Sequence, residues 1–189
     1  MSEERISETQ QLPHSVEAEQ AVLGGLMLTN DSFDTVASII AEADFFAHDH
    51  QLIFKTMRRL SEEDKPMDVI TLSETLQSTN ELNNVGGASY LVELADNPPS
   101  SANISAYANI VLERSIIRQL ISASSDIVKK GYNPLGWDSS KLLAEAEKNL
   151  IQIMENRPKT GGFLDVNTLI KQAVERIDEL FNTESDITG

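Results

Sequence analysis

Apolar residues in the first half of the chain recur every three or four positions, the spacing that places them on one face of an α-helix. Ser15 followed by two glutamates predicts the start of the first helix, because a serine hydroxyl accepts a free N–H and carboxylates favour the positive end of the helix dipole. The same spacing predicts shorter helices further on, two of them capped by Asp49 and Asp68. We therefore expect a globular helical subdomain over residues 13–102, preceded by a disordered tail over residues 1–12.

Three details of these helices follow from the pattern. The pair Gly24-Gly25 lies inside the first helix, where each glycine costs about 1 kcal/mol relative to alanine, so a close helix crossing is expected to offset the cost. The next helix is expected from Ser32 to Ile40. In the helix that Asp68 begins, the inward face is expected to carry Ile70 and two leucines.

Two longer helices come next in the sequence. The first is expected to begin with Asn103 as its cap and to stop at Gly131, and the second to run from a cap at Asp138 to about Asn156. Because a short loop separates them, the two helices predict an antiparallel hairpin over residues 103–156.

The apolar stripes of this hairpin are broader than two helices alone can bury. We therefore expect the hairpin to pack against a second copy of itself, with a seam in the second helix that has coiled-coil spacing. The residues assigned to self-association are Ile117, Leu120, Ile121, Leu143, Leu150 and Ile153. The alternative is that these side chains form only the internal packing of the hairpin.

The last part of the chain predicts a linker over residues 157–164 and a further helix over residues 165–182. The apolar face of that helix has no evident partner within the chain, so it is expected to dock on something outside this domain. The residues assigned to docking are Ile170, Ala173, Ile177 and Leu180. The alternative is a helix that folds back on its own domain. Taken together, the pattern predicts an all-α fold.

Composition narrows the possible partners. The chain has 30 acidic and 15 basic residues, a net charge of −15, which argues against direct nucleic-acid binding through phosphate contacts. The absence of cysteine excludes disulfides and thiolate metal sites and agrees with a cytoplasmic location. The sequence contains neither a signal peptide nor an apolar run long enough to span a membrane.

The motifs that usually carry catalysis are missing. The sequence has no GxxxxGK[ST] phosphate loop and no HExxH zinc motif. The three histidines are His14, His48 and His50, and the last two are spaced unfavourably for a shared metal ion, so a satisfied structural histidine is the preferred interpretation. We expect no catalytic residue, no cofactor site and no metal site in this chain.

Four segments, in order, carry a family resemblance: PHSVEAEQAVLGGLML at 13–28, DFF at 44–46, PMDVITL at 66–72 and GGASYL at 86–91. Further matching positions are His50, Ile53, Phe54, Pro99, Ser100, Asn103, Tyr107, Ile110, Val111 and Arg118. The chain resembles the N-terminal domain and linker helix of DnaB-type bacterial replicative DNA helicases. Its last residues, Thr188-Gly189, are similar to the segment that leads into the ATPase domain of that family, so residues 183–189 are expected to begin that connection.

The resemblance implies a hexameric helicase whose ATP and magnesium are bound by a RecA-like domain that this chain lacks. It implies that the N-terminal domains form a collar, a trimer of dimers joined by the hairpins, on which primase docks. It also implies that the linker helix packs on the ATPase domain of a neighbouring subunit, near which helicase loaders act. Tyr107 is a candidate primase contact by resemblance, although a core tyrosine is an equally good interpretation.

Two other functions compete with that of an assembly domain. A free-standing helical adaptor that binds helicase or primase would share the helical pattern, but it would not be expected to stop at Thr188-Gly189 after a docking helix. A small enzyme with an unrecognised site would show turnover, which an ATPase assay tests in part.

Overall fold

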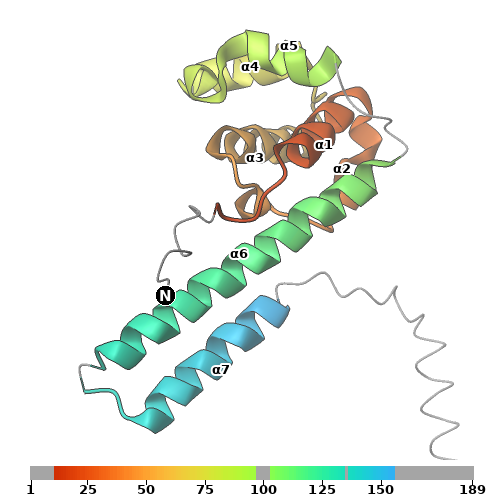
Figure 1. Cartoon of the computed structure of the whole chain (residues 1–189). Coiled ribbons are helices and arrows are strands. Elements are labelled where there is room, and N and C mark those ends of the chain that lie inside the picture. Colours follow the sequence, from red (N-terminus) through yellow and green to blue (C-terminus); the bar gives the residue numbers. More distant parts are fainter. Residues whose placement is uncertain (1–10, 97–102, 135, 156–189) are drawn as a thin grey trace, which may run out of the picture. The chain divides into compact units, whose positions relative to one another are not determined.

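The computed structural model describes residues 11–96, 103–134 and 136–155. Every regular element in these ranges is a helix, which confirms the all-α prediction (Figure 1). The chain divides into two units, residues 1–156 and 157–189. The predicted linker over 157–164, the helix over 165–182 and the residues after it lie outside the described residues, as does most of the predicted N-terminal tail.

Helix α1 (Val16–Leu28) packs against several other helices of the first unit and buries nine of its 13 residues. As predicted, Ser15 caps it, and the serine hydroxyl accepts the amide N–H of Ala18 at 3.2 Å. The predicted close crossing is also present, because a Cβ added at Gly25 would lie 2.9 Å from Cδ1 of Ile104 in α6 (Ile104–Tyr132). The glycine therefore lets the longest helix of the structure approach α1 directly.

The segment after α1 is shorter and more irregular than the pattern suggested. A 3₁₀ turn, η1 (Asn30–Ser32), leads into a five-residue helix, α2 (Phe33–Ala37), and a second turn, η2 (Glu42–Asp44), follows. The single helix expected from Ser32 to Ile40 is therefore wrong in extent. Ile40 reaches the core from the loop after α2.

Helices α3 (His48–Glu62), α4 (Val69–Ser78) and α5 (Gly87–Asp96) complete this side of the fold, with the turn η3 (Leu82–Val85) before α5. The predicted cap at the start of α4 is confirmed, since the carboxylate of Asp68 accepts the N–H of Thr71.

Two expectations for α3 and α4 were wrong. Asp49 lies in the first turn of α3, and Ala47 occupies the cap position. Ile70 is 76% exposed, because it lies two residues before the buried Leu72, about 200° around the helix and so on the opposite face of α4.

Helices α6 (Ile104–Tyr132) and α7 (Ser139–Glu155) run side by side in opposite directions (Figure 1). Asp138 caps α7, as its carboxylate accepts the N–H of Lys141. Asn103 occupies the cap position of α6 as predicted, although its side chain makes no cap bond. Helix α6 continues past Gly131 to Tyr132, so the predicted stop at Gly131 was too early.

The first half of α6 belongs to the same hydrophobic core as α1 to α5. Ile104, Ala108, Val111 and Leu112 are buried there, and Ser115 is the last buried residue of the helix. We call residues 11–96 with residues 103–115 the head, and residues 116–155 the arm. The core therefore extends beyond the boundary expected at residue 102, and the division into domains stays a prediction.

Candidate assembly surface

The exposed apolar side chains of α6 in the arm lie away from the face that enters the head. An α-helix advances about 100° per residue, so Leu120 lies roughly opposite Val111, which enters the head, and Ile121 and Val128 lie about 90° to one side of it. On α7 the same reasoning separates the positions that approach α6 from the exposed leucines. In the described part of α7 no residue is buried.

The residues predicted for self-association divide into two groups. Four are exposed, with relative exposures of 44% for Leu120, 39% for Ile121, 70% for Leu143 and 44% for Leu150. Ile117 and Ile153 are half-buried, so packing within the hairpin accounts for part of their coverage. That these residues join two copies stays a prediction.

Besides the aromatic Tyr132 and Trp137, the arm exposes three further apolar side chains that were not assigned to self-association from the sequence: Val128, Ile151 and Met154. Two shallow hollows lie beside them. One, of about 570 Å³, is lined by Leu120, Ile121, Ser124, Ser125, Val128 and Lys129. The other, of about 640 Å³, lies along α7 and is lined by Ala144, Glu147, Lys148, Ile151, Gln152 and Glu155. The two hollows give the arm a ridged surface into which side chains of another helix can fit.

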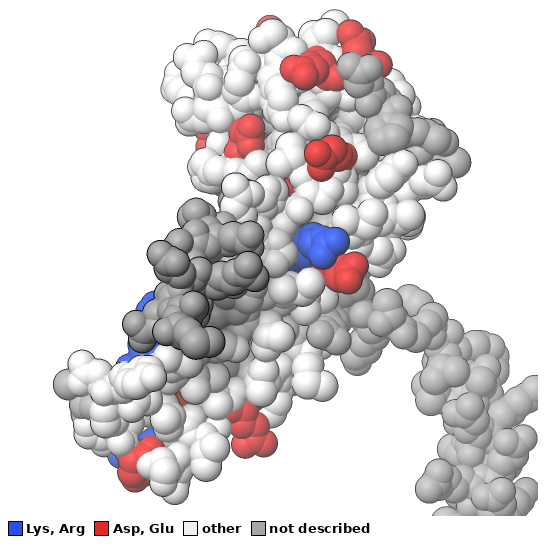
Figure 2. All heavy atoms as spheres, in the orientation of Figure 1, with Lys and Arg blue, Asp and Glu red and all other residues white. Residues whose placement is uncertain are grey.

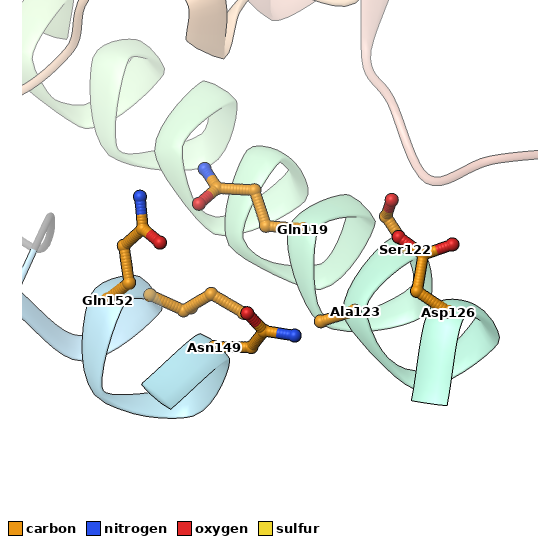
Figure 3. A pocket seen from close by; sticks show the side chains of 7 residues that line it. Gln119, Ser122, Ala123, Asp126, Asn149 and Gln152 are labelled. Carbon is orange, nitrogen blue, oxygen red and sulfur yellow. The ribbon is translucent and has the colours of Figure 1, made fainter. Parts of the chain in front are cut away.

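A third hollow, of about 270 Å³, lies between α6 and α7 (Figure 3). Its lining is mostly amide, hydroxyl and carboxylate, and consists of Gln119, Ser122, Ala123, Asp126, Asn149, Gln152 and Ile153. It offers hydrogen-bond partners without a histidine, a cysteine or a second carboxylate. This combination supports neither acid–base catalysis nor metal binding.

Within the head, a buried carboxylate on α1 connects this helix with α3 and with the loop before it. Glu19 of α1 is 1% exposed and accepts the backbone N–H groups of Phe46 at 2.7 Å and Ala47 at 3.3 Å. The same carboxylate lies 2.7 Å from Nδ1 of His50, which is also 1% exposed. A buried charge is tolerated when it is hydrogen-bonded in this way.

The chain of hydrogen bonds continues to α5. Nε2 of His50 lies 2.6 Å from the hydroxyl of Tyr90, and the side-chain amide of Gln20 donates to that hydroxyl at 3.1 Å. Every group is paired when Gln20 donates to Tyr90, Tyr90 donates to neutral His50, and His50 donates to ionised Glu19. Burial raises the pKa of the Tyr90 phenol above its ordinary value of 10.0, and nearby carboxylates, first that of Asp49, add to this effect.

Arg118 connects the arm to the loop over residues 44–47, which also contacts Glu19. Its guanidinium donates to the carbonyl oxygens of Pro13, at 2.8 Å, and of Asp44. It also lies 5.5 Å from the centre of the Phe46 ring, and the His14 ring stacks on the same phenyl ring at 4.2 Å between centres. Burial lowers the pKa of Arg118, whereas the charges of Glu19 and Asp44 oppose that shift.

Sequence reasoning missed this network as a unit. Glu19 lies 31 residues from His50, and His50 lies 40 from Tyr90. No spacing rule links such positions, although all three lie in segments that carry the family resemblance. His50 fits the satisfied structural histidine that was preferred, and among the described residues no group of three histidine, cysteine or acidic side chains is placed to hold a metal ion.

Charge is distributed unevenly between the two parts. The head carries 16 acidic and five basic residues, a net charge of −11, whereas the arm carries five of each. Figure 2 shows acidic side chains spread over the upper part of the head on the face that it draws. None of the described helices is long and apolar enough to cross a membrane.

The remaining predicted site residues are placed as follows. Tyr107 is half-buried and packs against the core, which fits the alternative interpretation as a core tyrosine. The docking residues Ile170, Ala173, Ile177 and Leu180 lie outside the described residues.

The arrangement of a helical head and a helical hairpin has known counterparts. The profile of the family described as DnaB-like helicase N terminal domain matches residues 11–113. The chain belongs to this family. A replicative DNA helicase DnaB of Buchnera aphidicola is 44% identical over 95% of this chain and 39% of its own length. The replicative DNA helicase DnaC of Bacillus subtilis is 36% identical over 94% of this chain and 38% of its own length.

Solved structures agree. The N-terminal domain of the DnaB helicase from Mycobacterium tuberculosis superposes with a TM-score of 0.72 and 31% identity, covering 75% of this chain and 99% of that domain. The N-terminal domain of the DnaB helicase from Helicobacter pylori gives a TM-score of 0.55 and 26% identity, covering 62% and 91% respectively. The chain therefore spans the N-terminal domain of such helicases and about two-fifths of the length of the curated relatives it matches.

Proposed function

We propose that this domain assembles copies of a hexameric replicative helicase into a collar and docks partner proteins. The observation that carries the proposal is the apolar face of the arm, whose side chains are too exposed for a hairpin that stays alone. An exposed apolar patch of this kind is typical of a protein–protein interface. Neither the arm nor the head contributes a catalytic group to this function.

The charge distribution supports contact through the arms. Two heads of net charge −11 repel each other, whereas two arms that each carry five acidic and five basic residues do not. Charge repulsion therefore opposes contact between two arms less than contact between two heads, and the arms also carry the exposed apolar side chains. This favours a dimer joined by its arms as the first step toward a trimer of dimers.

Light scattering tests this step. The molar mass of the isolated chain should rise from monomer toward dimer or beyond as its concentration increases. The double variant Leu143→Asp/Leu150→Asp should stay monomeric, because the two side chains lie on the exposed face of α7. The matched control is Ile70→Asp, which charges a side chain that is 76% exposed on the head and should leave association unchanged.

Two outcomes would contradict the proposal. The first is a wild-type monomer at all concentrations. The second is loss of association in Ile70→Asp but not in the arm variant, which would move the contact to the head. Circular dichroism of each variant separates lost association from lost folding.

Primase is the partner that we propose for the collar. The similar N-terminal domain of the Helicobacter pylori DnaB helicase interacts with primase, and this supports the same partner here. Tyr107 and its neighbours on α6 remain candidates by resemblance only. Titration of the chain with the primase of the same organism should give saturable binding. Tyr107→Ala should weaken this binding while leaving the melting temperature of the chain within a few degrees. An unchanged affinity would show that Tyr107 is not part of the contact.

The helix proposed over residues 165–182 is assigned to the ATPase domain of a neighbouring subunit, with a helicase loader acting near it. Ile177→Asp should leave this chain folded and impair unwinding by the intact helicase. A large fall in the melting temperature of the chain would instead indicate a helix packed on its own domain. ATP, magnesium, unwinding and action on DNA in the bacterial cytoplasm belong to the intact protein in this proposal.

The adaptor alternative and the enzyme alternative make different predictions. An adaptor would bind an intact helicase without exchanging into its ring, which mixed-ring formation with labelled helicase would reveal. An enzyme would show ATP turnover well above a mock preparation, which an assembly domain should not.

A further inference from the structure

The arm is attached to the head through a buried apolar stretch of α6 and through a polar contact at the end of that stretch. The apolar stretch runs from Ile104, whose Cδ1 would lie 2.9 Å from a Cβ added at Gly25 of α1, to Leu112. The polar contact lies at Ser115 and Arg118, the last side chains of α6 that hydrogen-bond to the head. With a rise of about 1.5 Å per residue, the stretch of α6 from Ile104 to Arg118 is roughly 20 Å long.

The second attachment is polar, unlike the first. Ser115 donates to the carboxylate of Asp44 at 2.7 Å, and Arg118 donates to the carbonyl oxygens of Asp44 and Pro13. The Phe46 ring lies beneath the guanidinium. Arg118 is half-buried, so these contacts are partly screened by water and are easier to open than the apolar contacts around Ile104.

The loop that Arg118 contacts lies between two opposite charges. Its Asp44 carbonyl points to the guanidinium, and its Phe46 and Ala47 N–H groups point to the carboxylate of Glu19. The carbonyl oxygen, which is the negative end of its peptide group, thus faces the cation, and the two N–H groups, which are positive ends, face the anion. Both orientations are electrostatically favourable. The contacts on the two sides of the loop therefore reinforce each other.

We propose that residues 44–47, held between Glu19 and Arg118, form a clamp that sets the angle between arm and head. Opening the clamp leaves α6 seated on the core from Ile104 to Leu112 and lets the rest of the helix, with the arm, tilt about the end of that buried stretch. The angle is a property of one chain and does not depend on association. Its consequence, that the clamp aims the apolar face of the arm, rests on the proposed function.

The leverage is large because the arm extends well beyond the clamp. Lys129 lies 17 residues after Leu112, or about 25 Å along the helix, so a tilt of about 10° moves it by roughly 4 Å. Displacements of this size are measurable between two spin labels. The chain has no cysteine of its own, so two introduced cysteines will be the only sites that react with the label.

The experiment measures the distance between labels at Gln77→Cys on α4 and Lys129→Cys on α6, both exposed positions. Labelled chains are diluted with unlabelled chains so that distances between copies do not contribute. With Arg118 intact, the distance distribution should be single and narrow. Arg118→Met should broaden it by several ångströms or add a second population, and Arg118→Lys, which keeps the charge, should give an intermediate result.

The matched control is Arg114→Met, one turn earlier on α6. Arg114 makes no hydrogen bond or ion pair among the described residues, so its replacement should leave the distribution unchanged. Glu19→Gln, which removes the anion from the far side of the loop, should broaden the distribution in the same direction as Arg118→Met.

A distribution in folded Arg118→Met that matches the wild-type chain would overturn the clamp. Equal broadening in Arg114→Met would also overturn it, since any lost cation on α6 would then have the same effect. If Arg118→Met does not fold, Arg118→Lys decides in its place, because an unchanged distance there contradicts a clamp that depends on the geometry of the guanidinium. Light scattering on the same samples reports association independently, so failure of the clamp and failure of the assembly proposal are distinguishable.

Discussion

The head and the arm are built from similar helices but are stabilised differently. In the head, apolar side chains from α1 to α6 share one core, and a buried carboxylate is fully paired. In the arm, two helices contact each other along one face, and no residue of α7 is buried in the described structure. The head has the buried core that is typical of a domain that folds alone, whereas the arm has the exposed apolar side chains that are typical of a protein–protein interface.

The largest expected difference concerns apolar side chains. Phe54 is fully buried between Phe33 and Phe45, so Phe54→Ala should lower the free energy of unfolding by about 3–5 kcal/mol through lost contacts and a cavity. Leu143, which is 70% exposed, should change it by less than about 0.5 kcal/mol as Leu143→Ala. Urea unfolding at a concentration at which the chain is monomeric measures both, and similar losses would show that the arm is as well buried as the head.

The next effect concerns the buried charge. Glu19→Gln places an amide where a carboxylate accepts three hydrogen bonds, which should cost about 1–3 kcal/mol in the free energy of unfolding. Glu17→Gln, two residues earlier and exposed, is the control and should be close to neutral. Urea unfolding that shows equal effects at the two positions would mean that the buried network contributes nothing specific.

The smallest effect depends on pH. Burial raises the pKa of the Tyr90 phenol in the folded chain above 10.0. The contribution of this phenol to the free energy of unfolding is therefore complete below about pH 10 and is lost as the pH rises through its pKa in the folded chain. Tyr90→Phe should cost about 0.5–1.5 kcal/mol at neutral pH by removing the hydroxyl between Gln20 and His50. It should also flatten the fall in stability above pH 10.

Thermal unfolding at several pH values measures both effects of Tyr90→Phe. Tyr132→Phe is the control in the arm, since Tyr132 is 89% exposed. An alkaline profile that is unchanged in Tyr90→Phe would show that other groups cause the fall.

Local patterns predicted local structure well. The caps at Ser15, Asp68 and Asp138 were read from the sequence because a cap bond joins residues only three positions apart. The close crossing at Gly25 was predicted from the cost of glycine in a helix, but its partner, Ile104, was not. Ile70 was assigned inward wrongly, since it lies two residues before the buried Leu72, a spacing that places the two side chains on opposite faces of a helix.

The sequence by itself determined the helical class, most helix positions, the acidic charge and the excess of apolar residues on the hairpin. These depend on spacings of a few residues and on totals, both of which can be read along the chain. Only the tertiary structure decided that Glu19 meets His50, that His50 meets Tyr90 and that Arg118 reaches Pro13. Such contacts join residues 31 to 105 positions apart, and they form only where packing of the core has brought the helices together.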